Sequence, residues 1–400
     1  MKAASIFAGI GGFDAGLAEA KHQTILNCEI HPAANAVLRE HFSHVEHHDD
    51  VTTLADLPSD VELLCAGFPC QDLSQAGMTA GIGGQRSSLV GEVFRLLQRR
   101  RVPRVIIENV PFMLHLQGGR ALEFIVGHLE ELGYRWAYRV VNTLAFGLPQ
   151  RRERVFLVAA IDVDPADVLL VDDVGVRESR ASLGEFAHGF YWTEGTRGLG
   201  WAPDAVPTLK NGSTVGIPSP PAILMPDGVV IKPSIQDAER LQGFPEDWTK
   251  PAEGVAKASW RWSLVGNAVS APVAAWIGRR LSAPGQYSRD RDRSLPGNRG
   301  WPKAARYDGT SRHEVAISTA PVWAARPPLH RFLHHPGTLL SAKATGGFLR
   351  RARASSLHFV DGFLEAVAVH LNRMTILERE TTATRRRRRG DAGAPAFAAE

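Results

Sequence analysis

A cysteine that follows a short apolar run is the first place where this sequence could carry out chemistry. The segment Gly67-Phe68-Pro69-Cys70-Gln71 comes directly after Val61–Ala66, whose continuous apolar character is typical of a buried strand. In open α/β sheets, ligands bind in the crevice at the carboxyl ends of the strands, where this cysteine would lie. A nearby cation or helix N-terminus would lower the thiol pKa from about 8.5 and favour the thiolate. We therefore predict that Cys70 is a nucleophile.

Charged residues adjoin two further apolar runs. Glu108-Asn109-Val110 follows the predicted strand Val105–Ile107, and Gln150-Arg151-Arg152-Glu153-Arg154 immediately precedes the predicted strand Val155–Ala160. Arginines at the start of a strand can hold a phosphate or orient a carboxylate. Taken alone, such arginines are more often ordinary surface charge.

A glycine-rich turn near the N-terminus indicates a nucleotide-like ligand. In Ser5-Ile6-Phe7-Ala8-Gly9-Ile10-Gly11-Gly12 a predicted strand enters the turn and a helix follows it. Glycines let the backbone approach a ligand closely, and a helix N-terminus offers free N–H donors. Glu29 lies 18 residues beyond Gly11, where an acidic residue can bind ribose hydroxyls, and Asp50 could reach an adenine edge. Tight packing at the turn and solvated carboxylates are the alternative explanation.

The elements that must position these residues alternate along the first part of the chain. We expect strands at five short apolar runs: Ala3–Phe7, Thr24–Cys28, Val61–Ala66, Val105–Ile107 and Val155–Ala160. We expect helices between them at four segments: Phe13–Ala20, Ala33–Phe42, Leu89–Arg100 and Ala121–Leu132. This alternation predicts an α/β fold with a mostly parallel sheet that is covered by helices on both faces.

The composition excludes several classes of protein. With 44% hydrophobic and 22% charged residues, the 400-residue chain is typical of a globular protein. No apolar run approaches the ~18 residues of a membrane span, and the glycine turn begins too early to leave room for a signal peptide. Cys28, Cys65 and Cys70 cannot all pair and show no zinc spacing, so we expect a cytosolic protein without a metal site. Cys28 and Cys65 lie within apolar strands and are predicted to be inert core residues.

The net charge of +4 is unevenly distributed. Residues 1–284 carry 26 basic and 32 acidic side chains, whereas residues 285–400 carry 20 basic and 10 acidic ones. A basic C-terminal portion suggests a polyanionic partner such as nucleic acid, and a solvated tail explains it equally well. Beyond residue 160 the pattern predicts an irregular region at 161–233, helices at Ser234–Leu241, Val269–Leu281 and Leu357–Met374, and a linker at Gly285–Gly300.

The order and spacing of six blocks resemble the DNA (cytosine-5)-methyltransferase family. The cofactor turn of that family is matched by Phe7, Gly9, Gly11 and Gly12, and its nucleophile loop by Pro69-Cys70. The other four blocks are Glu108-Asn109-Val110, Gln150/Arg152/Arg154, Arg240-Leu241-Gln242-Gly243-Phe244-Pro245 and Gly266-Asn267-Ala268-Val269-Ser270. The resemblance covers residues 1–282. Ser5-Ile6 departs from the family's frequent Asp-Leu, but no catalytic position differs.

The resemblance implies methyl transfer from S-adenosylmethionine to carbon 5 of a flipped cytosine through a covalent Cys70–C6 adduct. It implies that Glu108, with a pKa raised by burial, contacts the base, and that Arg152 and Arg154 orient Glu108 or hold the base or a phosphate. Asn109 would brace the loop. The implied cofactor-binding residues are Phe7, Gly9, Gly11, Gly12, Glu29, Ile30, Asp50, Val51, Pro69, Asn267 and Ala268. The implied substrate-binding residues are Ser74, Gln75, Arg86, Asn109, Gln150 and Thr208.

The resemblance also implies how the chain is divided. We expect a doubly wound Rossmann-like catalytic domain at 1–160 that is completed by 234–284, and a smaller irregular target-recognition region at 161–233. A basic extension at 285–380 and a disordered tail at 381–400 would follow. The partner would be double-stranded DNA, and the enzyme would either be functionally linked to a restriction endonuclease or be an orphan methylase. It would act as a cytoplasmic, nucleoid-associated monomer without a membrane partner.

Three other functions stay open at this point. A nicotinamide oxidoreductase could use the glycine turn, but hydride transfer would need neither Pro69-Cys70 nor Glu108-Asn109. A DNA-binding regulator with a vestigial site is disfavoured by the intact Cys70 and Glu108. The same chemistry on RNA is disfavoured, though not excluded, by the sizeable region 161–233 and the basic extension.

Overall fold

The computed structural model describes residues 1–69, 89–177, 182–212, 220–295 and 300–391, with side chains to residue 381. The chain forms two compact units. The first unit comprises Met1–Glu178, Thr208–Asn211 and Ile235–Arg326. The second unit comprises Ser179–Pro207, Gly212–Ser234 and Pro327–Glu400.

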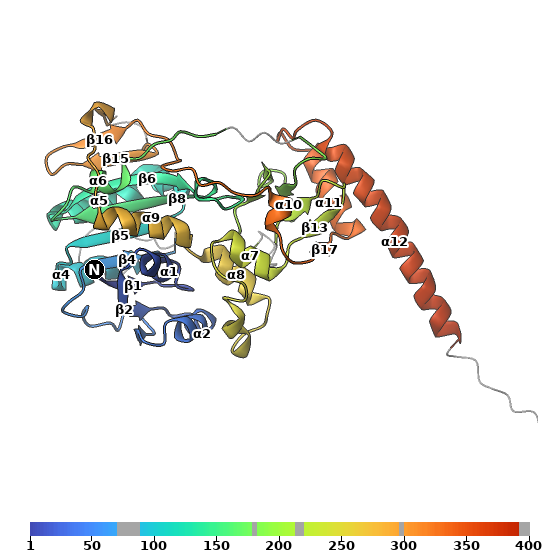
Figure 1. Ribbon diagram of the computed structural model, residues 1–400, viewed down its shortest axis with the longest axis horizontal. Helices are drawn as coiled ribbons and strands as arrows, with labels where there is room; N and C mark the ends of the chain where they lie inside the picture. The colour runs from blue at the N-terminus through green and yellow to red at the C-terminus, as the bar shows by residue number, and fades with distance from the viewer. Residues whose placement is uncertain (70–88, 178–181, 213–219, 296–299, 392–400) are drawn as a thin grey trace, which may run out of the picture. The chain divides into compact units, whose positions relative to one another are not determined.

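The first unit contains a large mixed sheet (Figure 1). Among the described residues its strand order is β14-β16-β15-β6-β8-β5-β4-β1-β2-β3. In chain order these strands are β1 (Lys2–Ile6), β2 (Gln23–Cys28), β3 (Glu46–His48), β4 (Leu63–Ala66), β5 (Arg104–Asn109), β6 (Arg135–Asn142), β8 (Glu153–Ala160), β14 (Asp292–Ser294), β15 (Ala304–Tyr307) and β16 (Arg312–Val315). A short strand, β7 (Gln150–Arg151), precedes β8.

The expectation of a mostly parallel sheet is correct for only one half of it. Strands β3, β2, β1, β4 and β5 pair in parallel, whereas β5–β8, β8–β6, β6–β15, β15–β16 and β16–β14 are antiparallel. The sequence analysis missed β6, because Arg135 and Arg139 interrupt its apolar pattern. The structure buries Arg139 by pairing it with Asp173 and with backbone carbonyls, which satisfies the charge inside the fold.

Helices cover both faces of this sheet, as predicted. Neighbouring residues of a strand face opposite sides, so Ile106 packs with α1 (Gly12–Glu19), α6 (Pro165–Leu169) and α9 (Ala271–Ser282), while Ile107 packs with α4 (Leu89–Arg99) and α5 (Arg120–Glu131). Burial on both faces explains why the strands read as continuous apolar runs. The other helices of the first unit are α2 (Pro32–His41), α7 (Ile235–Leu241) and α8 (Trp260–Asn267), with short 3-10 turns at Pro111–Leu114, Leu116–Gly119, Thr143–Phe146, Lys250–Gly254 and Arg289–Arg291.

The second unit is built from two distant parts of the chain. Its sheet has the order β10-β9-β12-β13-β17, with β9 (His188–Phe190), β10 (Trp201–Pro203), β12 (Ala222–Leu224), β13 (Val230–Lys232) and β17 (Thr338–Leu339). It also contains β11 (Val206–Pro207), α10 (Leu329–Phe332), α11 (Ala342–Arg353) and α12 (Phe363–Asp391). Phe190 of β9 packs between Phe348 of α11 and Phe363 of α12, at ring distances of 4.3 and 5.5 Å.

These units differ from the divisions predicted at the sequence level. Residues 161–178 and Thr208–Asn211 belong to the first unit rather than to the irregular region. The predicted extension is split: 285–326 adds β14, β15 and β16 to the large sheet, and 327–391 completes the second unit. The tail predicted as disordered begins inside α12, which continues to Asp391.

Two arginines of 285–326 are paired with carboxylates within the first unit. Arg306, which is 1% exposed, donates to both oxygens of Asp292. Arg312 bridges Glu123 and Glu130 of α5. This part of the extension therefore closes the edge of a sheet and is not a free basic arm. Within the described residues, no helix is both long and apolar enough to cross a membrane.

Replacing Phe348 by Ala should destabilise the second unit. Phe348 is 0% exposed in the core that joins the two parts of this unit, and its truncation should lower the free energy of unfolding by about 3–5 kcal/mol. Urea denaturation followed by tryptophan fluorescence measures this loss. Phe112→Ala, at a residue 60% exposed, should change stability by under about 0.5 kcal/mol. Equal losses in both variants would contradict the proposed core.

Candidate active site

The glycine turn joins β1 to α1 and holds a carboxylate from the end of β2. Gly9 has φ +58°, and its backbone N–H donates to Glu29 Oε2 at 2.8 Å. The second oxygen of Glu29 accepts from the N–H of His31 at 2.8 Å. A side chain added at Gly9 would meet no atom within 4 Å, so the turn is open on that side. The turn and the predicted acidic residue are therefore adjacent, as expected.

The glycine turn lies in close contact with two other segments of the first unit. A Cβ at Gly12 would lie 2.4 Å from the carbonyl oxygen of Val269, so only glycine lets α1 pack against the segment 266–270 here. Phe7 has φ +55°, an unfavourable backbone region for a residue with a side chain. Its ring packs edge-on against Phe68 at 6.2 Å, which connects the glycine turn with the loop that leads to Cys70. Gly11 caps α1 with φ +82°.

The remaining residues predicted to bind a cofactor differ in how exposed their side chains are. Ile30 is 70% exposed next to Glu29, and Asp50 accepts from the backbone N–H of Thr52, whose hydrogen bonds lower the pKa of Asp50. The side chain of Val51 is buried in the core and leaves only its main chain for a ligand. Asn267 is exposed at the end of α8.

Trp248 was not predicted as a site residue, although it supports the glycine turn. Its indole N–H donates to the carbonyl of Ile10 at 2.9 Å, and its ring stacks on His41 at 3.7 Å. The only hint in the sequence was that Trp248 lies shortly after Phe244-Pro245. Those two residues belong to a block that resembles the family, but no role was predicted for the residues next to it.

Asp14 is a second residue that sequence reasoning missed. It lies in the first turn of α1, is 1% exposed, and has its pKa raised to about 6 by burial, with the Thr24 and Ser5 hydroxyls opposing the rise. Its ionised form is therefore disfavoured beneath the glycine turn.

Glu108 ends β5 as a buried acid beside an arginine. The Nε of Arg154 lies 3.1 Å from Glu108 Oε1, and their side chains are only 13% and 9% exposed. Burial raises the pKa of Glu108, while the charges of Arg154 and Arg152 oppose the rise. The direction is the one predicted from the sequence. The antiparallel pairing of β5 with β8 places the start of β8, which carries Arg154, next to the end of β5.

The loop that leads to Cys70 passes directly over Glu108. A Cβ at Gly67 would lie 3.7 Å from Glu108 Oε2 and 3.8 Å from Val269. The side-chain amide of Asn109 donates to the carbonyl of Phe68 at 3.0 Å and so braces this loop, as predicted. The predicted residues Cys70, Ser74, Gln75 and Arg86 lie outside the described residues, and Pro69 is the last described residue before them.

Arg152 and Gln150 make contacts that differ from the predicted ones. Arg152 is 1% exposed and donates to the carbonyls of Leu209, Gly266 and Ala268, at 3.1, 3.1 and 2.7 Å. These bonds tie β8 to the segment 266–270 and do not direct the guanidinium to a substrate. The carbonyl of Ala268, predicted to serve a cofactor, is committed to this network.

Gln150 is fully buried in the same network. Its side-chain amide donates to the Leu241 carbonyl at 2.8 Å and to Gln242 Oε1 at 2.6 Å, and its oxygen accepts from the N–H of Leu209 at 3.0 Å. The predicted contact with substrate is therefore replaced by a structural role. Thr208, also predicted to bind substrate, donates from its hydroxyl to the Arg151 carbonyl at 3.0 Å.

The two described cysteines are unsuited to nucleophilic catalysis. Cys28 and Cys65 are free and buried, with 2% and 0% exposure. Burial raises the pKa of the Cys28 thiol to about 12 and that of Cys65 well above its ordinary value. The prediction that both are inert core residues is confirmed. Within the described ranges, no group of His, Cys, Asp and Glu could hold a metal ion.

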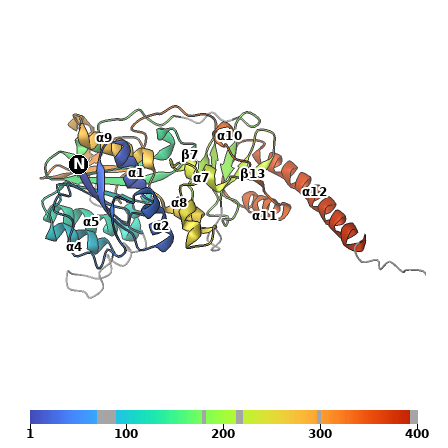
Figure 2. The same cartoon turned by 60° about the horizontal axis from the view of Figure 1, so that its bottom comes forward.

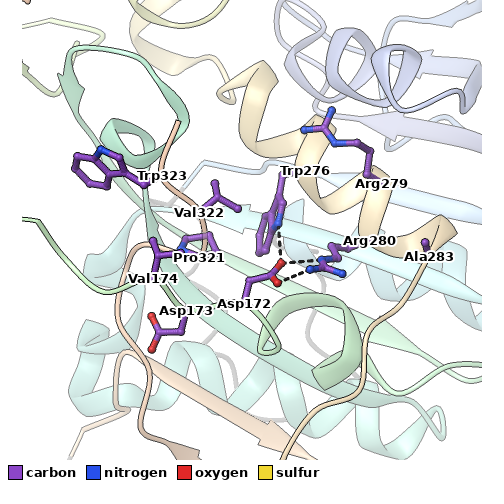
Figure 3. Close-up of a pocket in the computed structure, with 10 residues that line it drawn as sticks. All are labelled: Asp172, Asp173, Val174, Trp276, Arg279, Arg280, Ala283, Pro321, Val322 and Trp323. Carbon is purple, nitrogen blue, oxygen red and sulfur yellow. Dashed lines mark hydrogen bonds and ion pairs between the residues drawn. The ribbon is translucent and has the colours of Figure 1, made fainter. Parts of the chain in front are cut away.

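A cavity of about 500 Å³ in the first unit is separate from this site (Figure 3). Trp276 and Arg280 of α9 contribute to it, and Arg280 pairs with Asp172. The next residue of α9, Leu281, accepts through its carbonyl from Arg104 at the start of β5. None of the described residues that were predicted to be catalytic or to bind a cofactor lines this cavity.

Two solved structures share the fold of this chain. The Schizosaccharomyces pombe Dnmt2 methyltransferase is 17% identical, with a TM-score of 0.51, over 70% of this chain and 98% of that one. The Entamoeba histolytica methyltransferase EhMeth is 14% identical, with the same score and the same shares of both chains. The chain has the α/β Rossmann-like fold of these methyltransferases.

The family follows from the sequence comparisons. The model of the C-5 cytosine-specific DNA methylases matches residues 1–168. Type II methyltransferase M2.BsuMI of Bacillus subtilis is 45% identical over 380 residues, which cover 92% of this chain and 97% of that protein. Type II methyltransferase M.MspI of Moraxella sp is 26% identical over 69% of each chain. The chain belongs to the C-5 cytosine-specific DNA methylases and transfers a methyl group to cytosine, so it is not a nicotinamide oxidoreductase.

The buried Asp14 should make stability depend on pH. Its folded-state pKa of about 6 exceeds the unfolded value, so its contribution is full below about pH 4 and is lost as the pH rises through about 6. Over that window the free energy of unfolding should fall by roughly 3 kcal/mol relative to Asp14→Asn, which cannot ionise. Urea denaturation at a series of pH values compares the two proteins. Parallel pH profiles would show that Asp14 does not titrate in this way.

Proposed function

We propose that the enzyme methylates carbon 5 of a flipped cytosine in duplex DNA through a transient covalent bond to Cys70. The observation that carries this proposal is the buried Glu108–Arg154 pair directly beneath the loop that leads to Cys70. An acid, a cation and a nucleophile loop at one edge of a sheet are the groups that this reaction requires. Their proximity to the open glycine turn supports a shared site for base and cofactor.

The nucleophilic step activates an otherwise unreactive carbon. The Cys70 thiolate adds to C6 of cytosine, and the S–C6 bond makes C5 nucleophilic enough to take the methyl group. Removal of the C5 proton then expels the Cys70 thiolate and restores the ring. Splitting one hard step into easier ones in this way is the advantage of covalent catalysis.

Glu108 would make the ring ready for attack at C6. A carboxyl group with a raised pKa retains a proton that it can donate to N3 while its other oxygen accepts from the exocyclic amine. Arg154 would fix the orientation of this carboxyl group through their 3.1 Å contact. Asn109 would hold the Phe68 carbonyl and so position the Cys70 loop. Arg152 would brace the surrounding backbone, and its charge, like that of Arg154, would oppose the rise in the pKa of Glu108.

The glycine turn and its neighbours fit S-adenosylmethionine, which would supply the methyl group. The open side of Gly9 leaves room for a ligand against the backbone, and the carboxylate of Glu29 is held at the turn where ribose hydroxyls would bind. Ile30 offers an exposed apolar side chain to an adenine ring, and Asp50 an acceptor to its amine. Phe7 and Pro69 would border the transferred group.

The substrate and setting follow from the same family. Cytosine cannot react within the duplex stack, so it must be flipped out at a cost of a few kcal/mol. Ser74, Gln75 and Arg86 would contact the flipped nucleotide, and the second unit, with Trp192 and Trp201, would recognise the target sequence. The names of the relatives place them in type II restriction–modification systems, and we propose the same role beside a partner endonuclease for a monomeric enzyme that acts at the nucleoid in the cytoplasm.

Replacing Cys70 by Ala should abolish methylation. Bisulfite sequencing of DNA from cells that express the enzyme should show a methylated motif, and the motif should vanish with Cys70→Ala. Cys65→Ala is the matched control, because the buried Cys65 thiol has a pKa too high for catalysis, and the motif should persist. A motif that survives Cys70→Ala would overturn the nucleophile assignment, and the absence of any motif in wild type would overturn the proposed function.

Replacing Glu108 by Gln should lower the single-turnover methylation rate by about 100-fold or more, because Gln cannot pass a proton to N3. In the wild type, the rate should fall as the pH rises through the raised pKa of Glu108, and this alkaline decline should be missing from the variant. Glu131→Gln, at an exposed residue of α5, serves as the control and should leave the rate unchanged. A normal rate in Glu108→Gln would remove Glu108 from the mechanism.

A further inference from the structure

The second unit owes its positive charge to the C-terminal part of the chain. Its segments 179–207 and 212–234 carry 3 basic and 4 acidic residues, whereas 327–400 carries 12 basic and 6 acidic ones. The part that corresponds to the predicted target-recognition region is therefore almost neutral. Any electrostatic attraction of this unit to DNA must come largely from the segment that follows the methylase blocks.

Helix α11 carries four of these twelve basic residues and presents three of them on a defined face, whereas five others, Arg385–Arg389, lie outside the described side chains. Its buried side consists of Thr345, Phe348, Leu349 and Ala352, which pack into the core of the second unit. Lys343, Arg350 and Arg353 are exposed on the rest of the helix, and α11 contains no acidic residue. Lys343 and Arg350 are two turns apart, a rise of about 10 Å, which spans roughly three phosphates of one DNA strand.

Among the described residues, none of these three cations forms an ion pair, in contrast to Arg306 and Arg312 of the same C-terminal extension. A described carboxylate at the start of the helix, Glu378, accepts from the backbone N–H of Ala342 and forms no ion pair with Lys343. An arginine that already pairs with a carboxylate has lost part of its hydration and its charge is balanced, so contact with a phosphate lowers its free energy less. Unpaired exposed cations release counterions from DNA when they contact it, which provides a driving force for binding.

The fourth cation of α11 anchors the helix to the other part of the unit. Arg351 donates from Nε to the Glu194 carbonyl at 2.8 Å and from Nη2 to the Trp192 carbonyl at 2.5 Å. Figure 2 shows α11 beside α12 and near β13 in this unit. The exposed face of α11 is thus held in fixed geometry relative to the segment that follows β9.

Helix α12 is less suited to the same role. In its described part, Arg373 and Arg379 are accompanied by Glu365, Glu378 and Glu380. These carboxylates would repel the negatively charged phosphates of DNA.

We propose that the face of α11 formed by Lys343, Arg350 and Arg353 binds DNA phosphates, which makes the C-terminal segment a working part of target recognition. This inference rests on the proposed function, because it takes duplex DNA as the substrate that the second unit contacts. Phosphate contacts fix the position and register of the protein on the duplex and carry no base information themselves. The face therefore contributes affinity, while other residues of the unit read the sequence.

The test compares two triple variants with equal loss of charge. Lys343→Gln/Arg350→Gln/Arg353→Gln neutralises the α11 face and keeps helix propensity, since Gln ranks with Lys and Arg. Lys21→Gln/Arg101→Gln/Arg289→Gln removes three exposed cations of the first unit. Fluorescence anisotropy with a short duplex of mixed sequence gives the affinity over a salt series, and thermal melting verifies the fold.

We expect the α11 variant to reduce the slope of log Kd against log salt by roughly 2–3 and to raise the KM for DNA about 10-fold. The KM for S-adenosylmethionine and the methylated motif should not change, and the control should match the wild type. An unchanged slope in a folded α11 variant, or a loss that the control shares, would overturn the proposal. A changed motif would overturn the phosphate assignment, because it would mean that α11 reads bases.

If the triple variant does not fold, the single variant Arg350→Gln tests the proposal instead. It should reduce the slope of log Kd against log salt by about 1. The failure of the underlying function is distinguishable from the failure of this proposal. If the wild-type enzyme methylates DNA but all variants show the same slope of log Kd against log salt, only the role of α11 is rejected. If the wild-type enzyme methylates no DNA, the proposed function itself is rejected.

Discussion

The structure of the candidate site depends on one constraint, the burial of the Glu108 carboxyl group beside Arg154. A buried carboxylate is unfavourable without a partner, and the 3.1 Å contact with Arg154 supplies one while leaving the pKa raised. Burial therefore raises the pKa of Glu108 while the charge of Arg154 opposes the rise. The loop Gly67–Pro69 covers the end of β5 and β8 flanks it, and together they provide this environment.

The surrounding network keeps that environment rigid. Arg152 and Gln150 are buried charged and polar side chains that donate hydrogen bonds to backbone carbonyls and to the Gln242 amide oxygen. They join the start of β8 to the segment 266–270, which in turn packs against Gly12 of the cofactor turn. Residues that look catalytic by their type and family position can therefore act by holding the backbone on which the reacting groups are placed.

The second unit shows how a chain can extend beyond its catalytic blocks without adding an independent domain. The strands β9, β12 and β13 have too little apolar surface to form a core alone, and α11 and α12 supply the missing face. The same segment brings most of the unit's positive charge. The helices that complete the core and most of the unit's basic residues thus both come from 327–400, whereas 285–326 adds strands to the large sheet.

The sequence by itself determined most local elements of residues 1–160, although not β6, and also the two inert cysteines and the glycine turn with Glu29. These follow from apolar runs, glycine positions and residue types that act over short distances along the chain. The raised pKa of Glu108 was implied by the family resemblance and results from burial in the folded chain. The resemblance implied that Arg154 orients Glu108, and the tertiary structure gives the reason, because the start of a strand meets the end of its neighbour only when the two are antiparallel. Tertiary structure alone showed which backbone groups Gln150 and Arg152 bind and that α11 completes the second unit, because an apolar pattern does not name the distant partner against which it packs.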